Sequence, residues 1–163
     1  MPPSDPQADQ AWVTLSMESN GLSIGHTAFQ VDSCSATPIV GAATAFYTLP
    51  PCRLLDTRGA DGPALAAGVT RSFTAAGRCG VPATARAVSV NVTVVNASTG
   101  GDLRLFAADL PLPIANALSF GAGQTRSNNA ILGLSAGGAF LALSDQPAPA
   151  TVDLIVDVNG YFQ

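Results

Sequence analysis

Residues 50–63, PPCRLLDTRGADGP, bring a cysteine, two arginines and two aspartates together in a chain that is otherwise poor in charge. Carboxylate oxygens on a turn-rich segment are ligands that calcium prefers, so Asp56 and Asp61 are candidate calcium ligands. However, the alternating acidic spacing of an EF-hand loop is missing, and Arg53 and Arg58 lie beside these carboxylates. Because a neighbouring guanidinium already balances a carboxylate, we expect no metal and no cofactor here.

Ion pairs are the interpretation that we favour for this segment. Arg53 and Arg58 are expected to form bidentate hydrogen bonds with Asp56, Asp157 or a backbone carbonyl, as guanidinium groups commonly do. Asp157 lies near the end of the chain, so such bonds join the first strand of the folded unit to the last. The segment then stabilises the fold by joining two strands, and it is not a catalytic loop.

Catalytic chemistry has few candidates elsewhere. His26 is the only histidine, and the residues around it form neither a nucleophile elbow nor a zinc motif. A Ser-His-Asp triad can be assembled from any sequence so rich in serine and aspartate, which leaves that idea without specificity. We interpret His26 as a polar residue at a strand edge and predict that the protein is not an enzyme.

Composition excludes two classes of partner. All seven basic residues are arginines without a cluster, and the net charge is −4, so the phosphates of nucleic acid would remain unneutralised. The uncharged stretch 127–144 contains too many Asn, Gly and Ser residues to insert into a bilayer. The polar start, MPPSDPQADQ, also lacks the apolar stretch of a signal peptide.

Apolar residues alternate along several segments with the period of a β-strand. In residues 86–95 four valines at even positions share one face, and residues 151–158 repeat the pattern with Asp153 and Asp157 on the other face. Turn-forming residues separate shorter candidates at 12–17, 22–31, 45–49, 69–74, 102–106, 116–120, 129–134 and 139–143. We therefore predict an all-β fold, an antiparallel two-sheet β-sandwich that is Ig-like or jelly-roll-like.

Five segments in a consistent order carry a resemblance to a known kind of protein. Together they resemble an uncharacterised module at the ends of secreted and cell-surface bacterial proteins, with a P-x-R-hydrophobic-hydrophobic-D-T-R opening and a D-V-N-G-Y-F close. The resemblance covers about residues 46–162 and implies an extracellular, accessory, non-catalytic β module without catalytic residues to carry over. The matching segments are PCRLLDTR (51–58), GRCGVPATARAVSVNVTV (77–94), GDLRLF (101–106), FGAGQTRSNNAILGL (120–134) and VDLIVDVNGYF (152–162).

Two of the three cysteines lie within the matching segments. Cys52 and Cys79 are therefore the expected disulfide, and metal binding is the weaker alternative because no Cys-x-x-Cys pair or Cys/His cluster exists. Cys34 is left over, either as a buried free thiol or in a bond to a neighbouring chain. An extracellular location fits this disulfide.

Carbohydrate offers a second set of candidate sites. Asn91 and Asn96 begin Asn-x-Ser/Thr sequons, and both are expected to be accessible to a glycan. A carbohydrate-binding accessory domain is our alternative function, since exposed aromatic side chains bind sugar faces. Trp12, Tyr47 and Tyr161 are all the Trp and Tyr residues of the chain, and Tyr161 is expected to pack in the core.

Residues 1–45 precede the module, which we expect to occupy residues 46–163. Within them, residues 11–31 contain two strand-like runs around Ser19-Asn20-Gly21, and the first run includes Trp12, Val13, Leu15 and Met17. Such strands either fold back onto the module's own sheet or add to the sheet of a neighbouring copy. Our predicted function is an extracellular structural module that associates with copies of itself, with a fibre formed if the N-terminal strands add from one copy to the next.

Overall fold

The computed structural model describes residues 44–163, and residues 1–43 lie outside this description. The chain divides into two units, Met1–Ala42 and Ala43–Gln163, of which the second is described below. Every regular element within residues 44–163 is a β-strand, so the predicted all-β class is confirmed. The strands are β1 (Phe46–Asp56), β2 (Leu65–Ala66), β3 (Arg71–Thr74), β4 (Ala87–Val95), β5 (Gly101–Ala107), β6 (Leu118–Phe120), β7 (Arg126–Gly133), β8 (Ala139–Ser144) and β9 (Thr151–Phe162).

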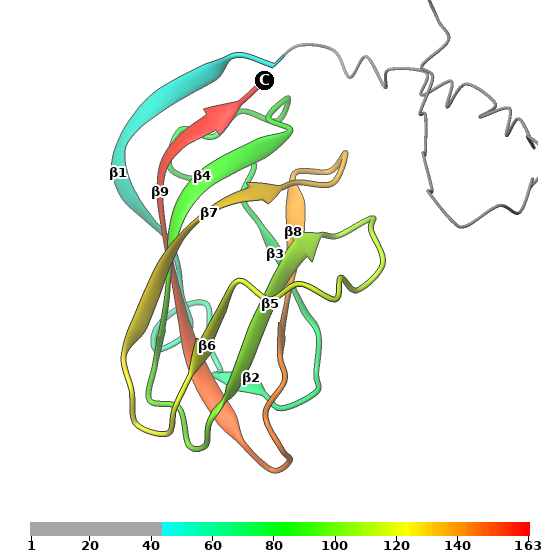
Figure 1. Ribbon diagram of the computed structural model, residues 1–163. Helices are drawn as coiled ribbons and strands as arrows, with labels where there is room; N and C mark the ends of the chain where they lie inside the picture. Colours follow the sequence, from blue (N-terminus) through cyan, green and yellow to red (C-terminus); the bar gives the residue numbers. More distant parts are fainter. Residues whose placement is uncertain (1–43) are drawn as a thin grey trace, which may run out of the picture. The chain divides into compact units, whose positions relative to one another are not determined.

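The strands form two antiparallel sheets that face each other (Figure 1). The first sheet has the order β1-β9-β4-β7, with the short β2 paired to the start of β9, and the second has the order β3-β8-β5-β6. With β2 set aside, consecutive strands lie in opposite sheets at every step except the β5–β6 connection. This arrangement is a jelly roll, which decides between the two topologies that the sequence left open.

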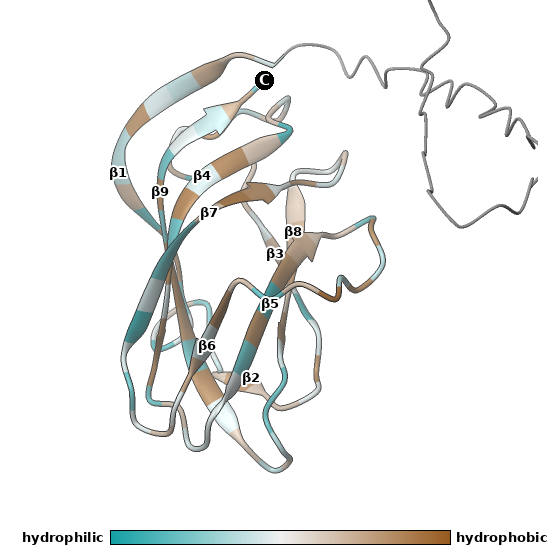
Figure 2. Ribbon diagram, viewed as in Figure 1, coloured by the Kyte–Doolittle hydropathy of each residue, from teal (hydrophilic) through white to brown (hydrophobic). Residues whose placement is uncertain are grey.

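The core lies between the sheets and follows the predicted alternation. Figure 2 shows hydrophobic and hydrophilic residues alternating along the strands of the first sheet. One face of β4 and β9 points inward, and its side chains are at most 1% exposed: Val88, Val90, Val92, Val94, Val152, Leu154, Val156 and Val158. Full burial of such a side chain stabilises the fold by about 1.5–3 kcal/mol.

The last strand, β9, is longer than predicted. β9 continues beyond residue 158 through Asn159 and Gly160 to Phe162, because β1 and β4 pair with it on both sides. A side chain at Gly160 would meet the Phe46 ring at 2.4 Å and the Tyr47 carbonyl oxygen at 2.8 Å. Because glycine has no side chain, β1 can pack closely against β9 at this position.

The strand predicted at residues 45–49 continues through residues 50–56. These residues extend β1, and Pro50 and Pro51 lie where the register between β1 and β9 shifts, between Thr48 and Cys52. Proline lacks the N–H that a central strand must donate, but an edge strand tolerates it at such an irregularity. β1 is an edge strand, and this position is why the two prolines did not end it.

Within residues 44–163 there is no helix long and apolar enough to cross a membrane.

Candidate functional site

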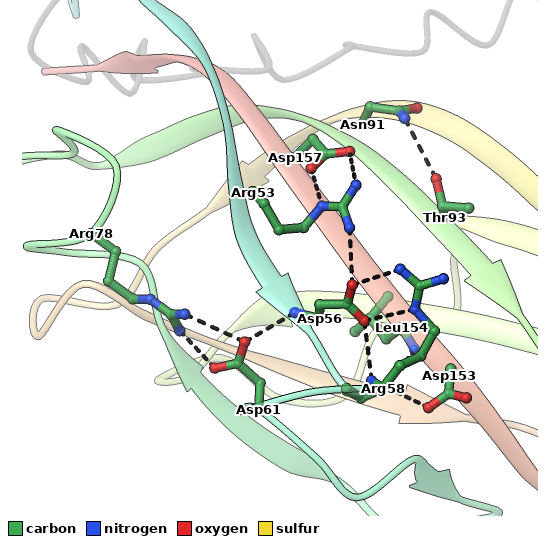
Figure 3. A network of polar contacts seen from close by, with 11 residues as sticks. Arg53, Asp56, Arg58, Asp61, Arg78, Asn91, Thr93, Asp153, Leu154 and Asp157 are labelled. Atoms are coloured by element: carbon green, nitrogen blue, oxygen red, sulfur yellow. Dashed lines mark hydrogen bonds and ion pairs between the residues drawn. The ribbon is translucent and has the colours of Figure 1, made fainter.

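The predicted ion pairs meet on the outer side of the first sheet, across β1 and β9 (Figure 3). Arg53 lies opposite Asp157 in the strand register and donates from Nε and Nη2 to both carboxylate oxygens of Asp157. Its Nη1 donates to Asp56 at 2.9 Å. One guanidinium thus bridges the first and the last strand, and these hydrogen bonds raise the pKa of Arg53 above its ordinary value.

Asp56 is the centre of this network, because two guanidinium groups bind its carboxylate. Arg58 donates from Nε to one oxygen at 2.9 Å and from Nη2 to the other at 2.7 Å. The backbone N–H of Arg58 also donates to the same carboxylate at 3.1 Å. The side-chain bond from Arg58 is the main reason that the pKa of Asp56 lies far below its ordinary value. The structure brings together Arg53, Asp56, Arg58 and Asp157, the four residues predicted to form these pairs.

Asp61 has a partner that the sequence did not suggest. Arg78 donates from both terminal nitrogens to its carboxylate, at 3.1 and 3.4 Å, and the backbone N–H of Asp56 donates to it at 3.0 Å. Burial raises the pKa of Asp61, but the bonds from Arg78 and from this N–H outweigh burial and lower it. Arg78 precedes Cys79, so the predicted disulfide was the one signal that it lies near this segment.

A second polar contact fixes the end of β1 against β9. Thr57, only 3% exposed, donates its hydroxyl to Asp153 at 2.9 Å and accepts from the backbone N–H of Leu154 at 2.9 Å. The N–H of Thr57 donates to the carbonyl of Leu154 at 3.0 Å. Because this buried hydroxyl both donates and accepts a hydrogen bond, it holds the two chain segments in one register. Sequence analysis missed Thr57, although it lies within the DTR motif.

The disulfide joins Cys52 of β1 to Cys79 of the β3–β4 connection, with the two Cα atoms 5.8 Å apart. Both cysteines pack against the hydrophobic core. Cys79 has a positive φ of 52°, and Gly80 follows with a φ of 79°, so the chain turns sharply at this point. The bond therefore holds this connection, and Arg78 with it, beside β1.

The carboxylates in this network are suited to ion pairing rather than to acid catalysis. Both Asp56 and Asp61 have a lowered pKa, whereas a general acid at neutral pH needs a raised one. Arginine nitrogens bind both carboxylates, and residues 44–163 contain no group of three or more His, Cys, Asp or Glu side chains placed to hold a metal ion. The network links β1 to β9.

The two sequons lie in different surroundings. Asn91 is in the middle of β4, with β9 and β7 on its two sides, and it is half-buried. Asn96 is exposed with a φ of 54°, and its amide donates to Asp153 at 2.9 Å. Glycan attachment to Asn96 replaces one hydrogen of that amide. Modification at either asparagine stays a prediction.

The aromatic residues at the ends of β1 and β9 lie in pairs. Tyr47 stacks on Tyr161 with ring centroids 5.1 Å apart, and Phe46 lies against Phe162 at 4.9 Å. The stacked face of Tyr47 is covered, although 46% of the residue is exposed. The stack gives the carbohydrate-binding alternative no specific support.

The remaining candidates lie outside the described residues. These are the strand candidate with Trp12, Val13, Leu15 and Met17, together with His26 and the unassigned Cys34.

Comparison with known proteins identifies no family. No family model matches the chain, and no curated protein matches it. Among solved structures, the Tobacco streak virus coat protein dimer is similar with a TM-score of 0.38 and 12% identity, over 71% of this chain and 86% of that chain. The C2 crystal form of the Tobacco streak virus coat protein is similar with a TM-score of 0.37 and 13% identity, over 73% of this chain and 88% of that chain. Similarity at this level does not assign a function.

Proposed function

We propose that this protein is an extracellular structural module that associates with copies of itself. The observation that carries the proposal is a set of exposed apolar side chains on the β5–β6 connection and on β7, of which Leu110 and Ile131 line the same groove. Leu110, Leu112 and Ile114 of the β5–β6 connection are 59%, 49% and 97% exposed, and Ile131 of β7 is 62% exposed. Exposed apolar residues that gather in one region are typical of interaction surfaces.

The β5–β6 connection is fastened in a way that keeps these side chains outward. Arg104 donates to the carbonyl of Pro113 at 3.0 Å, and Asn116 donates to the carboxylate of Asp102 at 2.8 Å. The backbone N–H of Ala117 donates to the carbonyl of Leu103 at 2.7 Å. A connection bound at its middle and its end cannot easily turn its apolar residues into the core, so they remain available to a partner.

Charge and covalent structure also support the proposal. Only 11% of the residues are charged and the net charge is −4, so charge repulsion between copies is weak. The disulfide between Cys52 and Cys79 persists in oxidising compartments, which supports an extracellular location. The resemblance of residues 46–162 to a secreted bacterial module points the same way.

Strand addition by the N-terminal segment is the mode of association that we propose. The run of Val13, Leu15 and Met17 alternates with Thr14 and Ser16, as a strand at the edge of a sandwich requires. A strand given by each copy and received by the next makes a heterologous contact, and such contacts continue into a fibre unless they close into a ring.

The test is sedimentation velocity of the full chain over a wide concentration range, followed by negative-stain microscopy. We expect a mass above the monomer that grows with concentration, and filaments in the micrographs. A Cys34→Ser variant belongs in the same experiment, so that a bond between Cys34 thiols is not mistaken for association. A protein that stays monomeric at every concentration contradicts the proposal.

A further inference from the structure

The edges of the two sheets differ in how well they can accept another strand. β7 ends the first sheet, and within residues 44–163 its backbone ladder runs along β4 alone. It is eight residues long and contains no proline, and Arg126 at its start is its one charged residue. β1 carries two prolines, while β3 and β6 have only four and three residues. A long edge without proline is the kind that pairs with another chain.

An apolar groove of about 330 Å³ lies beside this edge. β5, the β5–β6 connection and β7 form its walls, with Leu105, Phe106, Leu110 and Leu132 among the lining residues. Asn116 is the only polar side chain in the lining, which contains no charge. Figure 2 shows hydrophobic bands on β5 and on the connection that follows it, with hydrophilic bands between them. A strand added to β7 would place alternate side chains over this groove.

Residues 11–17, AWVTLSM, have the pattern that such a site requires. Val13, Leu15 and Met17 share one face of an extended strand, and Trp12, Thr14 and Ser16 share the other. The segment is uncharged, like the groove lining. Apolar side chains can therefore enter the groove while the hydroxyl groups face water.

The length of chain between this segment and the sandwich is sufficient to reach a neighbour. Residues 18–43 separate it from the first described residue, and a chain of that length spans at most about 90 Å. This span exceeds the width of a small domain.

We propose that the β7 edge and its groove are the receiving site for residues 11–17 of a second copy. This inference rests on the proposed function and adds the place where one copy holds the next. Each copy presents one donor segment and one groove. The donor segment of one copy therefore binds the groove of the next, and the contact repeats along a row of copies.

A charge placed in the groove tests the receiving site. Leu110 lines the groove and is 59% exposed, so Leu110→Asp should leave the sandwich folded. Its short carboxylate cannot reach water past an inserted strand, and we expect association to weaken at least about tenfold. Val69→Asp is the matched control, because Val69 is 51% exposed, lies outside the groove lining and belongs to the β2–β3 connection. Equal association of the two variants overturns the inference.

The donor is tested in the same way with the full chain. Leu15→Asp, on the apolar face of the segment, should abolish association, whereas Ser16→Asp on the other face should retain it. Far-ultraviolet circular dichroism and a thermal melt check that each variant is folded. Association of the Leu15→Asp variant at the level of the unaltered chain contradicts the assignment of the donor.

A mixture of the two defective variants separates exchange between copies from folding back within one chain. The Leu110→Asp copy keeps its donor and the Leu15→Asp copy keeps its groove, so we expect an equimolar mixture to form dimers and nothing longer. A mixture that stays monomeric overturns the inference, because a contact within one chain cannot be rescued by another. If the unaltered chain is itself monomeric, the proposed function fails instead.

Discussion

Opening the Cys52–Cys79 disulfide is the sharpest test of how this sandwich is stabilised. The bond joins an edge strand to the β3–β4 connection across a sequence separation of 27 residues. Besides this bond, β1 is paired with β9, and Arg78 binds Asp61 at 3.1 Å. We therefore expect the reduced protein to keep its fold and to lose mainly the restriction that the bond imposes on the unfolded chain.

The magnitude follows from the length of the closed loop. For a separation of 27 residues, the chain-entropy model gives a stabilisation of about 3.5 kcal/mol. In a unit of about 120 residues, 1 kcal/mol shifts the Tm by about 4 °C, so reduction should lower the Tm by about 14 °C. A serine at position 79 can keep the backbone geometry only with the strain of a φ of 52°, which cysteine already carries.

The assay is a pair of thermal melts, with and without a phosphine reductant, on a chain that carries Cys34→Ser. Thiol titration must show that two thiols have appeared, and the Cys52→Ser/Cys79→Ser double variant should melt at the temperature of the reduced protein. A Tm that changes by less than about 3 °C after complete reduction would refute the reasoning. So would a disulfide map of the unaltered chain that links Cys34 to Cys79.

Two further predictions concern the arginine–aspartate network. The side chains of Arg53 and Asp157 are 48% and 33% exposed, so a double-mutant cycle with Arg53→Ala and Asp157→Ala, measured by urea unfolding, should give a coupling of about 0.2–1 kcal/mol. A coupling of zero means that this bridge between β1 and β9 does not stabilise the fold. Asp56 and Asp61 have pKa values lowered by folding, so their contribution to stability is present above the unfolded pKa of about 3.9 and is lost as the pH falls below it. Melts at decreasing pH should show the Tm falling from about pH 4 downward, less steeply for Asp56→Asn, and a Tm that rises there contradicts this sign.

The residues of the ion pairs could be predicted from their types. The extent of β1 could not be predicted from its local sequence. Arg53, Asp56 and Asp157 were expected together because a guanidinium needs carboxylate partners in a chain with few charges. Pro50 and Pro51 suggested a loop, yet they lie within β1, since an edge strand loses nothing on the side where no strand accepts a hydrogen bond. Local sequence does not reveal which strand will be an edge.

The contacts that sequence analysis missed depend on proximity created by the fold. Asp61 was considered as a calcium ligand, but Arg78 binds it from 17 residues away because the disulfide holds the β3–β4 connection beside β1. Thr57 binds Asp153 and Leu154 across 96 and 97 residues. Such pairs have no periodicity or motif, so only the assembled strands bring them together.

The sequence by itself determined the class of the fold and the inward face of its main strands. Successive side chains of a strand point to opposite faces, so the alternation in β4 and β9 was sufficient to place their valines in a core. Tertiary structure alone decided that β1, β9, β4 and β7 share a sheet, because each pairing is chosen by contacts between distant segments. The same choice left β7 at an edge beside an apolar groove, which no alternation of residues could indicate.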